Sequence, residues 1–216
     1  MDLATFLTIG FSAIFVNNFV LARFLGLCPF IGVTQKVKNA LGMGAAVTFV
    51  MFMASSVTFT LYSLILVEGG AWVEQDLVLV LKTPMFILVI ATLVQLVEMF
   101  LRSRIPALYE ALGVYLPLIT TNCAIMGVAL INTTDTPEYM QASVDAGFAP
   151  GLLAASWHGI AAGLGFTVAM LLMSGIRERL DSADVPEPLR GTPIAFVCTG
   201  LMAMAFLGFS GMLGSG

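Results

Sequence analysis

Charged residues are scarce in this chain of 216 residues. Only 10% of the positions are Asp, Glu, Lys or Arg, whereas about 25% of a soluble domain is charged. Hydrophobic residues make up 59% of the positions, and the mean hydropathy is +0.99. So few polar side chains do not cover the surface of a soluble globule. We therefore expect residues 1–216 to form a single integral membrane domain within a lipid bilayer.

Cations, cysteines and histidines are also few. Nine Lys and Arg against thirteen Asp and Glu give a net charge of -4, which argues against nucleic acid as a partner because phosphate contacts need clustered cations. Three cysteines do not make a secreted disulfide framework, and one histidine does not make a metal site. Phosphate-binding glycine loops, zinc-type helix motifs and Ser-His-Asp sets are missing, so we expect no autonomous active site.

Long apolar runs are what the sequence has instead. A transmembrane helix needs ~20 apolar residues, and six runs are long enough. The sequence therefore predicts an all-α membrane protein with six transmembrane helices. The runs are Leu3–Phe24, Ala40–Val67, Leu77–Leu101, Ile105–Ile131, Gly151–Ile176 and Thr192–Leu213.

The cations are distributed unevenly among the connections between these runs. Seven lie in the first, third and fifth connections, and Lys82 alone lies on the opposite side. Because cytoplasmic loops are enriched in Lys and Arg, this asymmetry predicts that both termini lie on the non-cytoplasmic side. The seven are Lys36, Lys38, Arg102, Arg104, Arg177, Arg179 and Arg190.

Two of the apolar segments are interrupted. The stretch from Leu3 to Val33, about 31 residues, is too long for one span and too short for two, and it contains Pro29. The fourth segment contains Pro117 and a polar run directly before Cys123. Irregular backbone within a membrane is tolerated only where protein or a cavity shelters it. We therefore expect broken half-helices that meet near the midplane.

The two interruptions carry matching residues. Cys28-Pro-Phe-Ile-Gly32-Val33 aligns with Cys123-Ala-Ile-Met-Gly127-Val128. A glycine pair follows each of these segments, Gly42-Met-Gly44 in the first half and Gly163-Leu-Gly165 in the second. With three helices in each half, the second copy enters the membrane from the opposite face. This order predicts two inverted three-helix repeats, approximately 1–101 and 102–216, as in many transporters.

Cysteines at both interruptions suggest a metal site. A metal or an iron–sulfur cluster stabilises thiolates, and a cluster needs four such ligands, so a related protein chain would supply the other pair. Two alternatives remain open: the cysteines are ordinary small buried side chains, or Cys28 and Cys123 form a disulfide. Cys198 lies in the last run without a partner motif, and we interpret it as packing.

Other polar residues within the runs each have two interpretations. Glu98 lies one helical turn before Arg102, which favours an interfacial salt bridge, and the alternative is an ion-path carboxylate. His158 beside Trp157 is typical of an interfacial aromatic anchor, and the alternative is a ligand. Four residues at the interruptions are expected either to cap half-helices or to tune a cluster by hydrogen bonds. These four are Asn17, Asn18, Thr121 and Asn122.

Segments spread over nearly the whole chain resemble the A-type family of membrane subunits in the Rnf electron-transport complexes. The E-type subunits of sodium-pumping NADH:quinone reductases are similar too, but the paired Asn and the Leu-Cys-Pro form favour the Rnf branch. The segments are Asn17-Asn18-Phe-Val-Leu-Ala-Arg-Phe-Leu-Gly-Leu-Cys28-Pro-Phe, Leu116-Pro-Leu-Ile-Thr-Thr-Asn-Cys123-Ala, Gly175-Ile-Arg-Glu-Arg-Leu, Ala183-Asp-Val-Pro and Gly200-Leu-Met-Ala-Met-Ala-Phe-Leu-Gly-Phe-Ser-Gly211.

The resemblance implies a subunit of an ion-translocating oxidoreductase in a bacterial inner membrane, which couples electron transfer between ferredoxin and NAD to Na⁺ or H⁺ transport. It also implies a two-iron, two-sulfur (2Fe-2S) cluster ligated here by Cys28 and Cys123. The homologous E-type subunit would complete this cluster, and subunits B, C, D and G would be further partners. The alternative functions are a secondary transporter and a purely structural membrane subunit.

Overall fold

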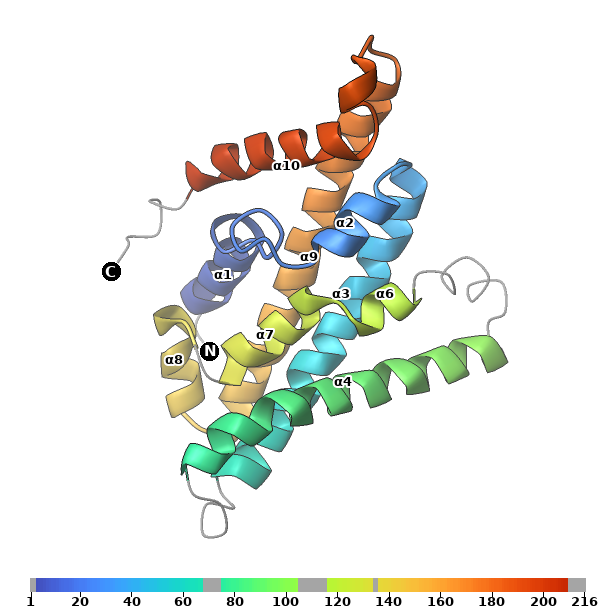
Figure 1. Ribbon diagram of the computed structural model, residues 1–216. Helices are drawn as coiled ribbons and strands as arrows, with labels where there is room; N and C mark the ends of the chain where they lie inside the picture. The colour runs from blue at the N-terminus through green and yellow to red at the C-terminus, as the bar shows by residue number, and fades with distance from the viewer. Residues whose placement is uncertain (1–2, 68–74, 105–115, 134–135, 210–216) are drawn as a thin grey trace.

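A computed structural model of the chain describes residues 3–67, 75–104, 116–133 and 136–209 (Figure 1). These residues are mostly helical and include no β-strand, so the all-α prediction is confirmed for this part of the chain. The helices are α1 (Leu3–Phe11), α2 (Leu27–Val33), α3 (Val37–Leu61), α4 (Gln75–Arg104), α6 (Leu116–Thr120), α7 (Cys123–Thr133), α8 (Glu138–Asp145), α9 (Phe148–Asp181) and α10 (Thr192–Leu207), with π-helical turns at Ser12–Val16 and Tyr62–Val67 and a 3-10 turn at Glu187–Leu189.

Among the described residues, two helices are long and apolar enough to cross a membrane, namely Val37–Leu64 and Phe148–Asp181. Shorter apolar helices coincide with the other four predicted runs. Positions 105–115 of the fourth run and 210–213 of the sixth run lie outside the described residues. The shorter helices are Leu3–Val16, Thr83–Leu96, Leu118–Thr133 and Thr192–Leu207.

α3 and α9 form the central helix pair, and they run antiparallel (Figure 1). Small residues let their backbones approach closely: a Cβ added at Gly163 would lie 2.5 Å from the Cα of Thr48, and one added at Gly44 would lie 2.6 Å from the side chain of Thr167. Membrane helices associate through such small-residue contacts, because lipid supplies no hydrophobic driving force between them.

The glycine alignment expected from the sequence differs from this contact. Gly44 and Gly163 occupy reciprocal positions in the helix pair, whereas the sequence alignment matched Gly42 with Gly163 and Gly44 with Gly165. Gly42 has no atom within 4 Å of an added Cβ, and Gly165 packs against Ala13 and Ile14 instead. Of the four glycines, Gly44 and Gly163 are therefore the two that lie at the contact between α3 and α9.

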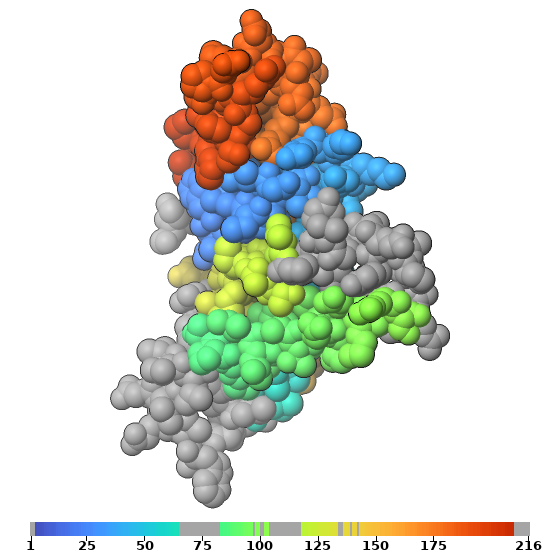
Figure 2. Space-filling view, turned by 45° about the vertical axis from the view of Figure 1, so that its right-hand side comes forward, coloured from blue at the N-terminus to red at the C-terminus, as the bar shows by residue number. Residues whose placement is uncertain are grey.

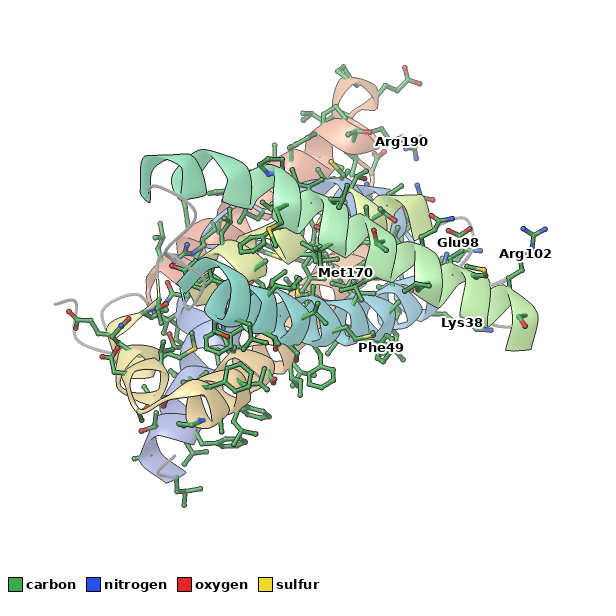
Figure 3. All side chains as sticks on the ribbon, turned by 90° about the horizontal axis from the view of Figure 1, so that it is seen from below. Lys38, Phe49, Glu98, Arg102, Met170 and Arg190 are labelled. Atoms are coloured by element: carbon green, nitrogen blue, oxygen red, sulfur yellow. The ribbon has the colours of Figure 1, made fainter. Side chains whose placement is uncertain are left out.

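Much of the outer surface is apolar. Figure 3 shows Phe49 of α3 pointing away from the bundle while Met170 of α9 lies within it. Phe49 is 51% exposed, and Leu88 of α4 and Leu201 of α10 are exposed as well, whereas Met170 is fully buried. Such an apolar exterior suits contact with lipid or with other membrane subunits.

The two predicted interruptions are present as short helices joined by irregular chain. The first is the irregular stretch between the π-helical turn that ends at Val16 and the seven-residue helix α2. The second is the break between α6 and α7. In the space-filling view, the segment 118–133 lies between the blue amino-terminal part of the chain and α4 (Figure 2). The prediction of interrupted helices at these two places is therefore confirmed for the described residues, and their meeting near the midplane stays a prediction.

Candidate cofactor site

Asn18 holds the first interruption together. Its side chain is fully buried, and its Oδ1 accepts hydrogen bonds from the backbone N–H groups of Val20 (3.0 Å) and Leu21 (3.2 Å). Its Nδ2 donates to the carbonyl oxygens of Ile14 (2.9 Å) and Gly165 (2.8 Å). The amide thus satisfies backbone groups that the broken helix leaves unpaired and ties the interruption to α9. Asn18 therefore organises the turn that follows it, whereas the half-helix α2 begins after Gly26 without a side-chain cap.

Gly26 sets the course of the chain into α2. Its φ angle is +80°, a left-handed conformation that favours glycine. A Cβ at this position would lie 2.6 Å from the ring of Phe166 and 3.0 Å from Oδ1 of Asn122. Glycine is therefore required here both for backbone conformation and for space. Cys28 follows in the first turn of α2.

Asn122 caps the helix that begins at Cys123. Its Oδ1 accepts a hydrogen bond from the backbone N–H of Ala124 (3.0 Å), as expected for an N-cap residue. The side chain is only 4% exposed. Its Nδ2 has no hydrogen-bond acceptor among the residues that the structure describes.

A single hydrogen bond brings the two interruptions together. The backbone N–H of Gly26, two residues before Cys28, donates to Sγ of Cys123 at 2.9 Å. Cys28 and Cys123 are both free thiols, and both are exposed on the surface of this chain. The two cysteines that the sequence singles out are thus drawn from separate halves into one region, where another protein chain has access to them.

Cys198 is placed differently. It is half-buried on α10 and packs against the apolar core, which agrees with its interpretation as packing. It is also a free thiol.

The donor set of this region matches half of an iron–sulfur site. Within the described ranges, no group of three or more His, Cys, Asp or Glu side chains lies close enough to hold a metal ion. Two exposed thiols therefore need two further ligands from outside the chain to complete the four of a 2Fe-2S cluster. The N–H of Gly26 on Cys123 and the unpartnered Nδ2 of Asn122 are donors of the kind that stabilise anionic sulfur. The residues present fit this group.

His158 belongs to a buried polar network and not to an interfacial anchor. Its Nδ1 lies 2.7 Å from Oδ1 of Asn132, and its side chain is 1% exposed. Nδ2 of Asn132 donates to Oγ of Ser55, which in turn donates to the carbonyl oxygen of Ala155 (2.6 Å). The anchor prediction is wrong because hydropathy locates a residue along a helix but not the face on which it lies.

Glu98 and Arg102 both lie towards the carboxyl end of α4 (Figure 3). Arg102 is exposed and Glu98 is half-buried. In the part of the chain that the structure describes, no ion pair joins the two side chains. The salt-bridge interpretation of Glu98 therefore gains no support from the fold.

Sequence reasoning did not single out Gly26 or the network around Asn132. A glycine directly before the Leu-Cys-Pro segment was the available signal for Gly26, because glycine marks a strained turn or a close approach. Asn132 could have been recognised as a polar residue at the end of an apolar run, because polar side chains in a membrane need hydrogen-bond partners.

Comparisons with known proteins agree with the motifs. The Rnf-Nqr subunit family, described as a membrane protein, matches residues 6–213. The A-type subunit of the Na⁺-translocating ferredoxin:NAD⁺ oxidoreductase complex of Acetobacterium woodii is 52% identical over 208 residues, which cover 96% of this chain and 98% of the relative.

Two further relatives are named as the A-type subunits of ion-translocating oxidoreductase complexes. That of Syntrophotalea carbinolica is 49% identical over 213 residues, covering 96% of this chain and 97% of the relative. That of Yersinia enterocolitica is 45% identical over 208 residues, with the same two coverages. The similarity therefore extends over nearly the whole length of both partners in each comparison. This chain belongs to the Rnf-Nqr family of membrane subunits.

Proposed function

We propose that this chain is the A-type membrane subunit of an ion-translocating oxidoreductase complex that couples electron transfer between ferredoxin and NAD to ion transport. The observation that carries the proposal is the 52% identity to the A-type subunit of such a complex over 96% of the chain. Na⁺ is the ion named for that relative, and Na⁺ or H⁺ is the ion moved here. Flavin and nicotinamide chemistry belongs to other subunits, since this chain has no motif for either cofactor.

Cys28 and Cys123 are proposed to hold one side of a 2Fe-2S cluster. Support comes from their exposure as free thiols and from the N–H of Gly26 that donates to Sγ of Cys123. When bound, the cluster supplies a one-electron carrier within the membrane part of the complex. The chain's own contribution is to fix the two thiols, which it does through the hydrogen bonds of Asn18 in the first interruption and through the cap that Asn122 provides to α7.

The remaining two ligands are proposed to come from a homologous E-type membrane subunit. A partner with the same fold would present its own pair of cysteines on the same kind of face, so two half-sites would form one cluster. Subunits B, C, D and G complete the complex. The reciprocal packing of Gly44 and Gly163 across α3 and α9 supports the proposal that each chain contains two inverted three-helix repeats with six spans.

Cysteine substitutions in the intact complex test this function. Cys28→Ala and Cys123→Ala should each remove one membrane-embedded iron–sulfur signal from the electron paramagnetic resonance (EPR) spectrum of the reduced complex, and should lower its iron content. Cys198→Ala is the matched control and should keep both at wild-type level. Unchanged spectra and iron content in the first two variants, with the complex assembled, would overturn the cluster and favour a secondary transporter.

Reporter fusions test the proposed orientation. With both termini on the non-cytoplasmic side of a bacterial inner membrane, a carboxy-terminal alkaline phosphatase fusion should be active and a fluorescent-protein fusion should be dim. The reverse pattern would require a different orientation or number of spans.

A further inference from the structure

The side-chain amide of Asn122 has a donor that the described residues leave unused. Oδ1 accepts a hydrogen bond from the N–H of Ala124 at 3.0 Å. The oxygen of the amide is thereby identified, and the other end is the Nδ2 donor. Nδ2 is buried and has no acceptor among the described residues. Because an unsatisfied buried donor destabilises a protein, an acceptor supplied on assembly would stabilise the complex.

Asn18 at the other interruption provides the comparison. Its Oδ1 also accepts backbone N–H groups, but its Nδ2 donates to two carbonyl oxygens of the same chain, those of Ile14 and Gly165. The amide of Asn18 is therefore satisfied internally, and that of Asn122 is not. A capping role alone does not explain why Asn122 keeps a free donor.

The surroundings of Asn122 indicate where its acceptor lies. Asn122 directly precedes Cys123, and its Oδ1 borders Gly26, the residue whose N–H donates to Sγ of Cys123. Asn122, the residue that carries the free donor, is thus the sequence neighbour of the thiol that we assign to the shared cluster. The other buried donor without a partner in the described part of the chain, Oγ of Ser174, belongs to α9 and adjoins neither cysteine in the sequence.

We propose that Nδ2 of Asn122 donates a hydrogen bond to a sulfur atom of the cluster held between this chain and its partner, and so raises the reduction potential of that cluster. This inference rests on the proposed function. A hydrogen bond to sulfur stabilises the more negative, reduced cluster more than the oxidised one, and such bonds are among the factors that set cluster potentials. The chain therefore tunes the cluster from its second interruption.

Two substitutions in the intact complex separate this role from capping. Asn122→Ser keeps an oxygen that accepts the N–H of Ala124 but removes the amide donor. Asn122→Asp keeps the shape and the cap and replaces the donor with an acceptor, so it remains informative if the serine variant assembles poorly. Asn17→Ser is the control, because Nδ2 of Asn17 already donates to Oγ of Ser12 at 3.0 Å.

The measurement is a redox titration of the Cys28- and Cys123-dependent EPR signal, with iron content determined on the same samples. Both Asn122 variants should shift the midpoint potential to more negative values while Asn17→Ser leaves it at the wild-type value. Pulsed EPR of a complex labelled with ¹⁵N-asparagine should show a nitrogen coupling that both Asn122 variants lose.

An intact cluster with wild-type potential in both Asn122 variants would overturn the hydrogen bond and leave the proposed function standing. A complex without any signal that depends on Cys28 and Cys123 would overturn the proposed function as well, so the two failures are distinguishable.

Discussion

Oγ1 of Thr48 lies 3.4 Å from Oγ1 of Thr167 where α3 crosses α9. Each hydroxyl donates to the carbonyl oxygen of the glycine four residues earlier on its own helix, Gly44 or Gly163, at 2.8 Å. The two helices therefore present the same Gly-xxx-Thr unit to one another in opposite directions. This reciprocal contact joins the two halves of the chain through their central helices, and it leaves no room for a larger side chain at either glycine.

Gly163→Ala should destabilise this crossing. Its Cβ would lie 2.5 Å from the backbone of Thr48, so the helices must separate, and overpacking of this kind costs about 1–3 kcal/mol. The midpoint of thermal unfolding of the detergent-solubilised complex measures the effect. Gly175→Ala on the same helix is the control, because an added Cβ there meets no atom within 4 Å. Equal midpoints for the two variants would contradict the packing role of Gly163.

Gly26→Ala should disturb the cysteine region specifically. A non-glycine residue in a left-handed conformation costs roughly 1–2 kcal/mol, and the new Cβ would also overlap Phe166. The backbone should move and weaken the hydrogen bond from Gly26 to Sγ of Cys123, so we expect reduced iron content in the purified complex.

Gly32→Ala on α2 serves as the control for Gly26, since nothing lies within 4 Å of its added Cβ. Its complex should keep wild-type iron content. If Gly26→Ala also kept wild-type iron, the close approach at Gly26 would not matter for the site.

Asn132→Ala should destabilise the bundle through its buried network. The substitution leaves Nδ1 of His158 and Oγ of Ser55 without their bonds to the Asn132 amide, at a cost of about 1–3 kcal/mol. Thermal unfolding of Asn132→Ala, His158→Ala and the double variant forms a double-mutant cycle. The two losses should be non-additive by about 0.5–3 kcal/mol, as for residues in one hydrogen-bond network. Additive losses would mean that the two side chains act independently.

Glu98→Gln tests the ion-path interpretation of this carboxylate. Ionisable groups within membrane segments commonly mark ion pathways, and Glu98 is not paired with Arg102 within the described chain. We expect ion transport in reconstituted vesicles to fall while the complex still assembles. Arg102→Gln is the control and should transport normally. Loss of transport in both variants to the same extent would instead indicate that the pair acts as a structural unit.

The architecture was predictable where it depends on local properties of the chain. Low charge and long apolar runs predicted an all-α membrane protein, and the family comparison and the helices agree. Asparagines within apolar runs marked the two interruptions, because their side chains satisfy the free ends of the helical hydrogen-bond ladder. The prolines do not form the breaks: Pro29 lies inside α2 and Pro117 inside α6, in the first turn of each helix, where a missing N–H removes no helical hydrogen bond. The cap that Asn122 provides to α7 followed from the same reasoning.

The relationships between distant segments were decided only by the tertiary structure. The contact between Gly44 and α9 was not predicted, the burial of His158 was missed, and the hydrogen bond from the N–H of Gly26 to Cys123 could not be foreseen. Hydropathy and helix-breaking residues act over one or a few turns of chain, so the sequence by itself determined the elements and their interruptions. The packing of residues far apart in the sequence decides which helix faces meet and which thiol accepts a hydrogen bond from which N–H group. Gly26 and Cys123, which share such a bond, are 97 positions apart.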